Sequence, residues 1–203
     1  MRVVGLISGG KDSIYSLVEC VRHGHEVVCL ANLAPPGEND AAVDELDSFM
    51  FQTVGHRGVE FIAQATELPL VRRVTTGEAK SKSVAYTQQE GDEVEDLFQL
   101  LSDVKQRFPD VQAVASGAIL SDYQRVRVEN VCKRLGLVSL SFLWQRDQTE
   151  LLNEMLESRM NVILVKTAVM GLEPRFHLGK SLLQLHALLM RLRDEYGMNV
   201  CGE

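Results

Sequence analysis

Residues 8–13 read Ser-Gly-Gly-Lys-Asp-Ser and lie between a short apolar run, residues 2–7 (RVVGLI), and a segment with helical spacing of apolar side chains, residues 13–23. Residues 26–33 (EVVCLANL) form a second apolar run of the kind found in buried strands. The order strand, glycine loop, helix, strand predicts a right-handed parallel crossover.

The same alternation continues toward the middle of the chain. We expect helices over residues 44–67, 92–108 and 121–135, strands over residues 69–75, 111–115 and 138–143, and a loop or lid over residues 76–91. Strand–helix alternation predicts an α/β fold, an open and mostly parallel five-stranded sheet with helices on both faces. Ligands of such sheets bind at the carboxyl ends of the strands, where the loop of residues 8–13 belongs.

The C-terminal quarter of the chain has a separate pattern. We expect a helix over residues 150–158, a strand over residues 162–168 and a long helix over residues 178–196. The predicted domains are therefore 1–144, which carries the glycine loop, and 145–203, a smaller α/β appendage on the substrate side.

Composition restricts the class of protein. The chain has 203 residues, of which 45% are hydrophobic and 24% charged, with a net charge of -7. This acidic balance disfavours nucleic acid as a partner. The four cysteines include no CxxC pair, and no stretch reaches the length of about 20 apolar residues that a membrane span needs. We expect a soluble cytoplasmic protein with reduced thiols.

The glycine loop has the chemistry of an anion site. Gly9 and Gly10 permit a tight turn that brings backbone N–H groups to one point at a helix N-terminus. Lys11 adds positive charge, and the serine hydroxyls add donors. Asp12 would repel a phosphate unless a divalent cation lay between them, so we expect it to be a Mg²⁺ ligand.

The SGGKDS sequence resembles the signature of the pyrophosphate-loop (PP-loop) ATP pyrophosphatases, whose sheet is of the adenine nucleotide alpha hydrolase type. The resemblance implies that this loop holds the pyrophosphate part of ATP, that Asn32 contacts adenine, and that the turn after the fourth strand lines the nucleotide pocket. The implied ATP-binding residues are Ser8, Gly9, Gly10, Lys11, Asp12, Ser13, Asn32, Gly117 and Ala118.

Longer stretches resemble the diphthine–ammonia ligase family, among them residues 45–56 (ELDSFMFQTVGH), 90–97 (EGDEVEDL) and 117–137. The resemblance implies that ATP and Mg²⁺ are used to adenylate the carboxylate of diphthine on a translation elongation factor. Pyrophosphate is released, and ammonia displaces AMP to give diphthamide. That family continues past the Cys-Gly-Glu at residues 201–203, so we expect the second domain to be truncated.

Each of the remaining candidate site residues has two interpretations. An acidic cluster around residues 90–96 is either a solvated helix start or an attraction for the cationic diphthine, with aromatic rings adding cation–π contacts. The candidate substrate-binding residues are Glu90, Glu93, Asp96, Tyr123 and Trp144, with Asp92, Glu95 and Tyr86 nearby.

Two arginines are candidates for the charge that develops on the α-phosphate. Arg125 and Arg127, grouped with Lys11 and Asp12 as catalytic, lie two apart on a predicted helix, so both reach one phosphate only if that turn is irregular. The alternative is a salt bridge with Glu129. Asp122 is either a second metal ligand or the helix cap.

Two other functions stay open at this point: another PP-loop enzyme, such as a tRNA-modifying thiolase or an amidotransferase, and a non-catalytic ATP-binding module. Lys180 fits a surface lysine better than an anion ligand. His56, His177 and His186 fit structural positions.

Overall fold

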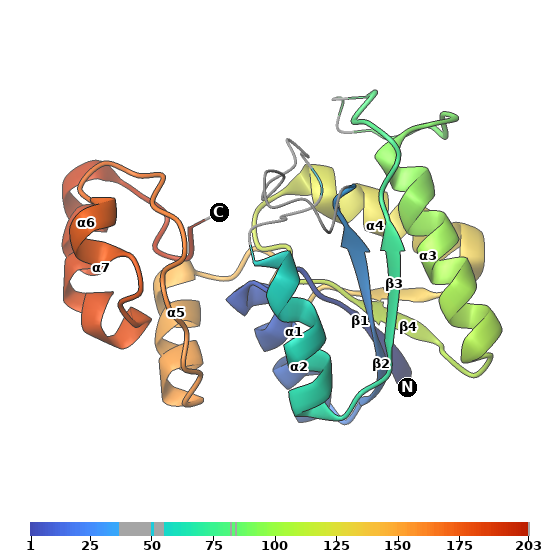
Figure 1. The fold of residues 1–203 in the computed structure, drawn as a ribbon, viewed down its shortest axis with the longest axis horizontal. Coiled ribbons are helices and arrows are strands. Elements are labelled where there is room, and N and C mark those ends of the chain that lie inside the picture. The colour runs from blue at the N-terminus through green and yellow to red at the C-terminus, as the bar shows by residue number, and fades with distance from the viewer. Residues whose placement is uncertain (37–49, 51–54, 82, 84, 203) are drawn as a thin grey trace. The chain divides into compact units, whose positions relative to one another are not determined.

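The computed structural model describes residues 1–36, 50, 55–81, 83 and 85–202 (Figure 1). The chain divides into two compact units, Met1–Trp144 and Gln145–Glu203. The helix expected over residues 44–67 falls partly outside the described residues. Its described part consists of a 3-10 helix, η1 (His56–Gly58), and α2 (Val59–Thr66).

The first unit is built on one five-stranded sheet with the order β3-β2-β1-β4-β5, in which every neighbouring pair is parallel. The strands are β1 (Arg2–Leu6), β2 (Glu26–Ala34), β3 (Leu70–Val74), β4 (Ala113–Ala115) and β5 (Val138–Leu140). The predicted parallel α/β sheet is confirmed. The chain leaves β1 toward β2 on one side and later returns to β4 on the other, so the strand order reverses between β1 and β4.

Helices cover both faces of this sheet, and alternate strand residues explain why. Val3 packs in a buried cluster with Leu17 of α1 (Lys11–Arg22), whereas Val4 packs in a second cluster with Leu100 of α3 (Glu93–Arg107). The helix α2 belongs to the first cluster and α4 (Asp122–Leu135) to the second. Because both sides of β1, β2 and β4 are largely buried, these strands read as continuous apolar runs, whereas the edge strands β3 and β5 are partly exposed.

The helix ends follow local capping rules. Asp92 caps α3 by accepting from the Val94 N–H, and Ser121 caps α4 by accepting from the Gln124 N–H. Gly136 ends α4 in the left-handed conformation, at φ 66°. The predicted bounds of both helices therefore agree with the structure to within one residue.

The second unit is helical, with α5 (Gln148–Glu157), α6 (Pro174–His177) and α7 (Leu182–Tyr196). The strand expected over residues 162–168 is wrong. Ile163 forms a single antiparallel bridge with Ser181, and no second strand extends that pairing in the part of this unit that the structure describes. The expected α/β character of this unit is therefore corrected to helical.

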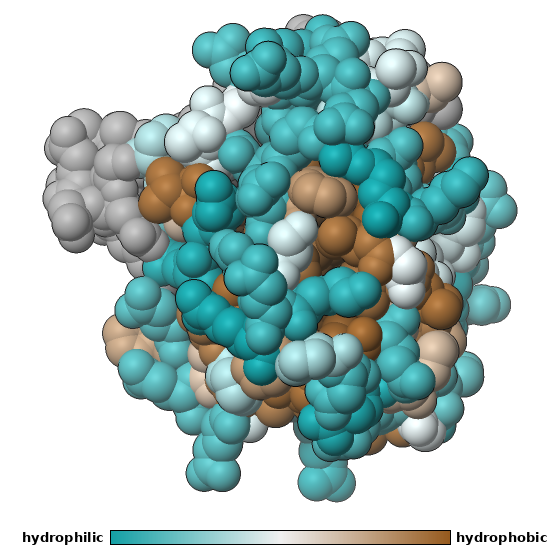
Figure 2. All heavy atoms as spheres, turned by 90° about the vertical axis from the view of Figure 1, so that its right-hand side faces the viewer, coloured by the Kyte–Doolittle hydropathy of each residue, from teal (hydrophilic) through white to brown (hydrophobic). Residues whose placement is uncertain are grey.

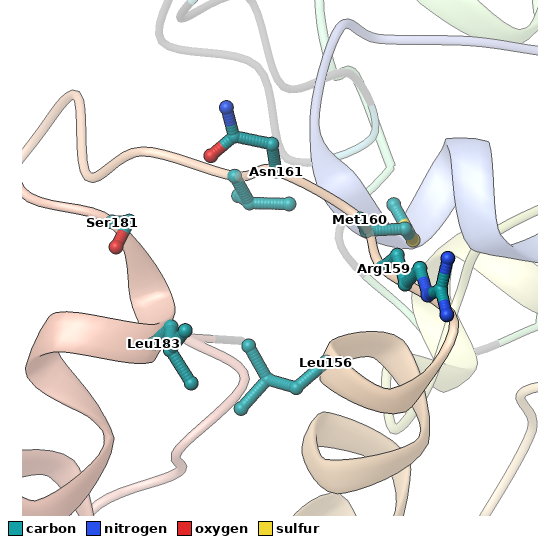
Figure 3. Close-up of a pocket in the computed structure, with 7 residues that line it drawn as sticks. Leu156, Arg159, Met160, Asn161, Ser181 and Leu183 are labelled. Carbon is teal, nitrogen blue, oxygen red and sulfur yellow. The ribbon is translucent and has the colours of Figure 1, made fainter.

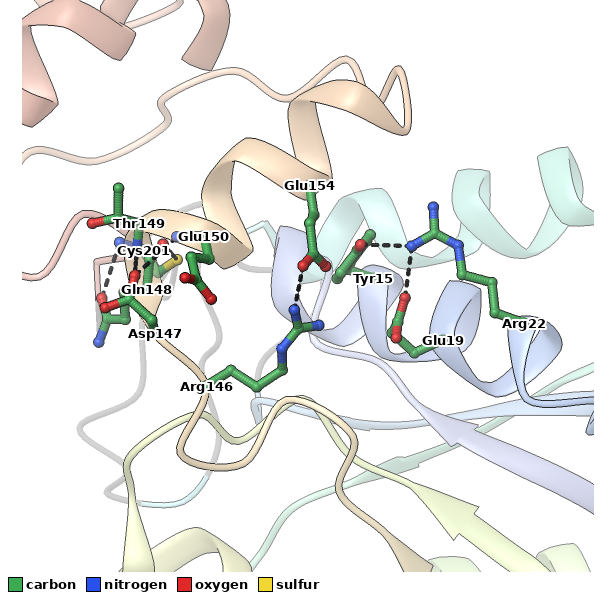
Figure 4. Close-up of polar contacts among 10 residues, drawn as sticks. All are labelled: Tyr15, Glu19, Arg22, Arg146, Asp147, Gln148, Thr149, Glu150, Glu154 and Cys201. Atoms are coloured by element: carbon green, nitrogen blue, oxygen red, sulfur yellow. Dashed lines mark hydrogen bonds and ion pairs between the residues drawn. The ribbon is translucent and has the colours of Figure 1, made fainter.

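Side-chain contacts fix the ends of the second unit's helices. Asp147 caps α5 with bonds from the Thr149 and Glu150 N–H groups, and Arg146 pairs with Glu154 (Figure 4). The long helix begins at Leu182 and not at residue 178, because Ser181 and Gln184 form a capping box there.

All four cysteines are buried, and none forms a disulfide. Burial raises the pKa of the Cys20 thiol to about 11 and those of the Cys29 and Cys132 thiols to about 12. In the second unit, the Cys201 thiol donates to the Gln148 carbonyl oxygen at 3.3 Å (Figure 4).

The side of the first unit that carries α3 and α4 has a mostly hydrophilic surface, with apolar atoms showing mainly near its centre (Figure 2). Among the described residues, no helix combines the length and the apolar character needed to cross a bilayer.

The cluster under α3 predicts a large effect on stability. Leu100 is fully buried between α3 and the sheet, so Leu100→Ala should lower the free energy of unfolding by about 2–5 kcal/mol in urea titrations. Val21→Ala, on the exposed side of α1, is the control and should change it by less than about 0.5 kcal/mol. Equal losses in the two variants would contradict this account of the core.

Candidate functional site

The glycine loop follows β1 and leads directly into α1 at the carboxyl edge of the sheet. Gly9 has φ +87°, and a side chain there would place its Cβ 2.8 Å from the Gly55 carbonyl oxygen. Gly10 precedes the helix in an extended conformation and has no side chain to cap it. The first N–H groups of a helix have no acceptor within the helix, so this edge presents donors suited to an anion.

Two serine hydroxyls close the loop on itself. Ser13 Oγ donates to the Gly10 carbonyl at 2.8 Å and accepts from the Ser8 N–H at 3.3 Å. Ser8 Oγ accepts from the Gly10 N–H at 3.4 Å. The predicted phosphate-binding serines thus hold the shape of the turn.

A charge pair lies at the start of α1. Lys11 Nζ is 2.8 Å from Asp12 Oδ2, and the two side chains are 12% and 23% exposed. Burial raises the pKa of the Asp12 carboxyl above its ordinary value, although the ammonium of Lys11 opposes that shift. The other carboxyl oxygen, Asp12 Oδ1, is buried and has no hydrogen-bond partner among the described residues.

The turn after β4 lies against the glycine loop. A Cβ on Gly117 would stand 2.7 Å from the Ser13 backbone nitrogen and 2.8 Å from the Asp12 carbonyl carbon, so no other residue fits without a shift of one of these backbones. Ala118 follows, buried. The structure therefore brings residues 8–13 and 117–118 together at the point where the strand order reverses.

The buried side chain of Asn32 is engaged by the protein. Its Nδ2 donates to the Ile7 carbonyl at 2.8 Å, and its Oδ1 accepts from Arg72 Nε at 2.9 Å. Arg72 also donates to the His56 carbonyl and pairs with Glu60. Sequence reasoning missed Arg72, although a charged residue inside an apolar strand was a signal for a specific partner.

The two candidate arginines are not brought together. The helix α4 runs as a regular α-helix from Asp122, so the irregular turn that both would need is absent there. Arg125 pairs with Asp122 at 3.0 Å and Glu129 at 2.7 Å, and its guanidinium lies 4.7 Å from the centre of the Trp144 ring. The cap is Ser121, which corrects the alternative that placed Asp122 in that role.

Arg127 is fully buried, and its guanidinium binds backbone oxygens of the segment before α3. It donates to the Ser81 carbonyl at 2.7 Å and the Ser83 carbonyl at 3.0 Å. The Tyr123 ring centre is 3.3 Å away and the Tyr86 ring centre 5.4 Å away. Tyr123, a predicted substrate-binding residue, and the nearby Tyr86 thus already contact a cation of this chain.

The acidic cluster is not a solvated helix start. Asp92, Glu93 and Asp96 are buried, and Glu90 is the exposed member. Asp96 accepts from the Thr75 hydroxyl and from the Thr76 and Gly77 N–H groups at 2.7–2.8 Å. Despite the cost of burial, these bonds hold the pKa of Asp96 below its ordinary value.

Glu95, on the same helix, joins α3 to α4. Its two carboxyl oxygens accept from Arg134 at 2.7 and 2.8 Å, and it also accepts from the Tyr86 hydroxyl at 2.9 Å. The bonds from Arg134 lower the pKa of the Glu95 carboxyl. Arg134 is a second residue that the sequence did not single out.

The remaining candidates have structural partners. His56 is buried beside Arg72, His177 Nδ1 accepts from the Glu173 N–H, and His186 is 2.8 Å from Asn153 Oδ1. Lys180 is exposed. Within the described residues, no group of three or more His, Cys, Asp and Glu side chains is placed to hold a metal ion.

A separate pocket of about 300 Å³ lies in the second unit, where Leu156 and Leu183 face one another (Figure 3). It is lined by Leu156, Arg159, Met160, Asn161, Val162, Ser181 and Leu183. None of these is a predicted site residue, and the lining contains no carboxylate or imidazole, so the candidate chemistry stays with the glycine loop.

Known proteins resemble the chain over its full length. A family model described as the diphthamide synthase N-terminal domain matches residues 1–139. The diphthine–ammonia ligase of Bos taurus is 54% identical over 203 residues, covering 100% of this chain and 75% of that protein. The diphthine–ammonia ligase of Danio rerio is 55% identical over 203 residues, covering 78% of that protein.

Among solved structures, the "predicted subunit of tRNA methyltransferase" from Methanocaldococcus jannaschii aligns over 98% of this chain and 90% of its own. Its TM-score is 0.40, and its sequence identity is 13%. This likeness is too distant to bear on function.

The charge pair predicts a titration effect. Lys11→Met removes the ammonium that opposes burial, so the pKa of the Asp12 carboxyl should rise further. Carboxyl ¹³C chemical shifts followed through a pH titration measure it. Lys133→Met, at an exposed lysine of α4, should leave the Asp12 titration unchanged. A lower Asp12 midpoint in Lys11→Met would refute this account of the pair.

Proposed function

The chain belongs to the diphthine–ammonia ligase family, and on that premise we propose that it converts the carboxylate of diphthine, on a translation elongation factor, into the amide of diphthamide. ATP supplies the activation and ammonia supplies the nitrogen. The observation that carries the proposal is identity of more than half over the whole chain to relatives that all bear this name. Translation factors act in the cytoplasm, which is the proposed location.

The proposed reaction has two steps. A carboxylate oxygen of diphthine attacks the α-phosphorus of ATP, the bond to the β-phosphate oxygen breaks, and pyrophosphate leaves. Ammonia then attacks the acyl carbon, AMP leaves with the activating oxygen, and one proton is lost from nitrogen. Neither step needs a protein nucleophile, since positioning and electrostatic stabilisation supply the rate.

We propose that the glycine loop binds the departing pyrophosphate. The supporting features are the turn at Gly9, the helix N-terminus at Lys11, and the Lys11 ammonium itself. Charge accumulates on the leaving pyrophosphate as the bond breaks, so donors already aimed at it stabilise the transition state more than the ground state. Gly117 would let the nucleotide lie close to the backbone of the opposite turn.

Asp12 fits a role beside a divalent cation. Its Oδ1 is buried without a hydrogen-bond partner among the described residues. Burial also raises the pKa of the Asp12 carboxyl, so a positive ion beside Oδ1 would stabilise the charged form. Asp12 would hold Mg²⁺ through that oxygen, with the phosphates as further ligands. Bound there, Mg²⁺ would neutralise phosphate charge and improve the leaving group. Asp122 is paired with Arg125, so it is a weaker candidate.

The two other functions make different predictions. A PP-loop enzyme acting on tRNA would release pyrophosphate in the presence of tRNA, and a nucleotide-binding module would release none. Pyrophosphate release that requires both ammonium and the diphthine-bearing factor distinguishes the proposed ligase from both. No such dependence in the wild-type chain would refute the proposal.

Lys11 provides the sharpest test of the loop. Lys11→Met should lower kcat for pyrophosphate release by roughly 10²–10³-fold, the size of effect seen when one preorganised donor is removed from a transition state. Circular dichroism would confirm that the variant is folded. Lys133→Met is the matched control and should keep the wild-type rate. Wild-type turnover in Lys11→Met would remove this lysine from the mechanism.

Gly117 tests the close approach of the two turns. Gly117→Ala places a methyl group 2.7 Å from the Ser13 nitrogen, so the loop must shift and kcat/KM for ATP should fall on the order of 10²-fold. Gly58→Ala is the control, since a Cβ there meets nothing within 4 Å at an ordinary φ of -73°. Equal kcat/KM values in the two variants would show that the nucleotide does not use this turn.

A further inference from the structure

The connection between β3 and α3, which the structure describes over residues 75–81, 83 and 85–92, begins at the carboxyl end of β3. It leaves β3 and reaches α4, where the Tyr123 hydroxyl donates to the Ser81 carbonyl at 3.2 Å. The helix α4 follows β4, and β2 and β1 lie between β3 and β4 in the sheet. The connection therefore lies on the same edge as the glycine loop.

The same region connects to the glycine loop through the backbone. The turn that leads from β4 into α4 contains Gly117, which lies against Ser13. One side of this turn thus contacts the proposed pyrophosphate site, and the helix that follows it holds the connection. A carboxylate that approached the glycine loop from the α3–α4 side, as the acceptor of the adenylyl group, would lie beside this connection.

Two buried carboxylates hold the connection from α3. Asp96 binds the Thr75 hydroxyl, the Thr76 hydroxyl and N–H, and the Gly77 N–H at 2.7–3.2 Å. Asp92 accepts from the Lys80 N–H at 3.2 Å and, more weakly, from the Ser81 N–H at 3.4 Å, while capping α3. A buried carboxylate that receives several N–H bonds is a rigid anchor, because releasing it would leave a desolvated charge.

Arg127 holds the far part of the connection from α4. Its guanidinium donates to the carbonyls of Ser81 and Ser83 and stacks on the Tyr123 ring. The two carboxylates thus fix N–H groups near the start of the connection, and the arginine fixes carbonyl groups further along. The negative carboxylates thus bind backbone N–H groups, and the positive guanidinium binds backbone carbonyl groups.

Gly77 adds a steric constraint that involves no charge. A Cβ at this position would lie 2.7 Å from the Asp92 carbonyl carbon and 2.7 Å from the Glu93 nitrogen. Glu78 pairs on both sides of this contact, through its N–H to Gly91 and its carbonyl to the Glu93 N–H, at 3.2 Å each. The connection therefore packs backbone against backbone at the start of α3.

From these contacts we infer that the connection forms a wall of the site for the protein acceptor, and that Asp92, Asp96 and Arg127 are positioning residues that fix it. The inference rests on the proposed ligase function. The acids act on the acceptor through the place of the backbone and not through attraction of its trimethylammonium group. Their hydrogen-bonding capacity is already used by this chain.

A pair of variants separates position from charge. Gly77→Ala displaces the connection and leaves every charge in place, whereas Asp96→Asn removes the charge and replaces one of the two accepting oxygens with an NH2 group that donates. Both should raise KM for the diphthine-bearing factor at least tenfold, with the KM for ATP changed less than twofold and the salt dependence of the factor's KM unchanged. Gly58→Ala and Asp103→Asn are the controls, the second at a half-buried acid of α3 paired with Arg73.

The outcomes are distinct. If Asp96→Asn raises KM and flattens its salt dependence while Gly77→Ala behaves as wild type, the acids attract the substrate and the inference is overturned. Wild-type KM in both variants overturns it as well. Failure of the proposed function has another signature, since the wild-type chain itself would then release no pyrophosphate with the factor and ammonium.

Amide hydrogen exchange measures how firmly Asp96 holds the connection, and it does so independently of catalytic turnover. The Thr76 and Gly77 amides should exchange at least tenfold faster in Asp96→Asn than in Asp103→Asn. Arg127→Ala leaves a gap beside Tyr123, and millimolar guanidinium should restore part of its kcat/KM for the factor. If that variant does not fold, Arg127→Lys keeps the charge but not the paired geometry and should show the same KM rise. Unchanged exchange or an unchanged KM counts against the inference.

Discussion

The close approach of two backbone turns at the carboxyl edge of the sheet sets the geometry of everything around it. Gly117 leaves no space for a side chain against residues 12–13, and Gly9 leaves none against the Gly55 carbonyl. The Gly117 contact follows from the strand order, which places the turns after β1 and β4 side by side, whereas Gly55 belongs to the connection between β2 and β3. The helix α1 then starts at this edge, and the Lys11–Asp12 pair lies there because it occupies the first turn of that helix.

The charged residues around this edge divide into two groups by what they bind. Lys11 and Asp12 are partly exposed and pair with each other, which leaves one Asp12 oxygen without a protein partner among the described residues. Asp96 and Arg127 are buried and bind backbone atoms instead. Burying an ion is costly unless several hydrogen bonds replace its hydration. Asp96 meets that condition with bonds at both carboxyl oxygens, and Arg127 meets it at Nη1 and Nη2, while its Nε has no partner among the described residues. Lys11 and Asp12 are therefore suited to binding a ligand, and Asp96 and Arg127 to stabilising the local structure.

Much of the fold could be read from the sequence because its signals are local. Continuous apolar runs predicted buried strands, and Gly136 predicted the end of α4, whereas its cap is Ser121 and not Asp122. The strand expected at residues 162–168 failed because β-propensity is realised only with a partner, and Ile163 has a single bridge. The proximity of residues 8–13 to Gly117 follows from the topology, while their binding role stays a prediction. The partners of Asp96 and Arg127 were out of reach, because they lie about twenty and more than forty positions away in sequence.

The burial of the cysteines has a practical consequence. A thiol reacts with alkylating reagents and peroxides as its thiolate, and the raised pKa values of Cys20, Cys29 and Cys132 keep that form scarce at neutral pH. Because Cys201 is buried as well, we expect the cysteines of the folded chain to react only slowly with maleimides. A single cysteine introduced at an exposed position of α4 or α7 would therefore accept a fluorophore or spin label selectively, without prior removal of the native thiols.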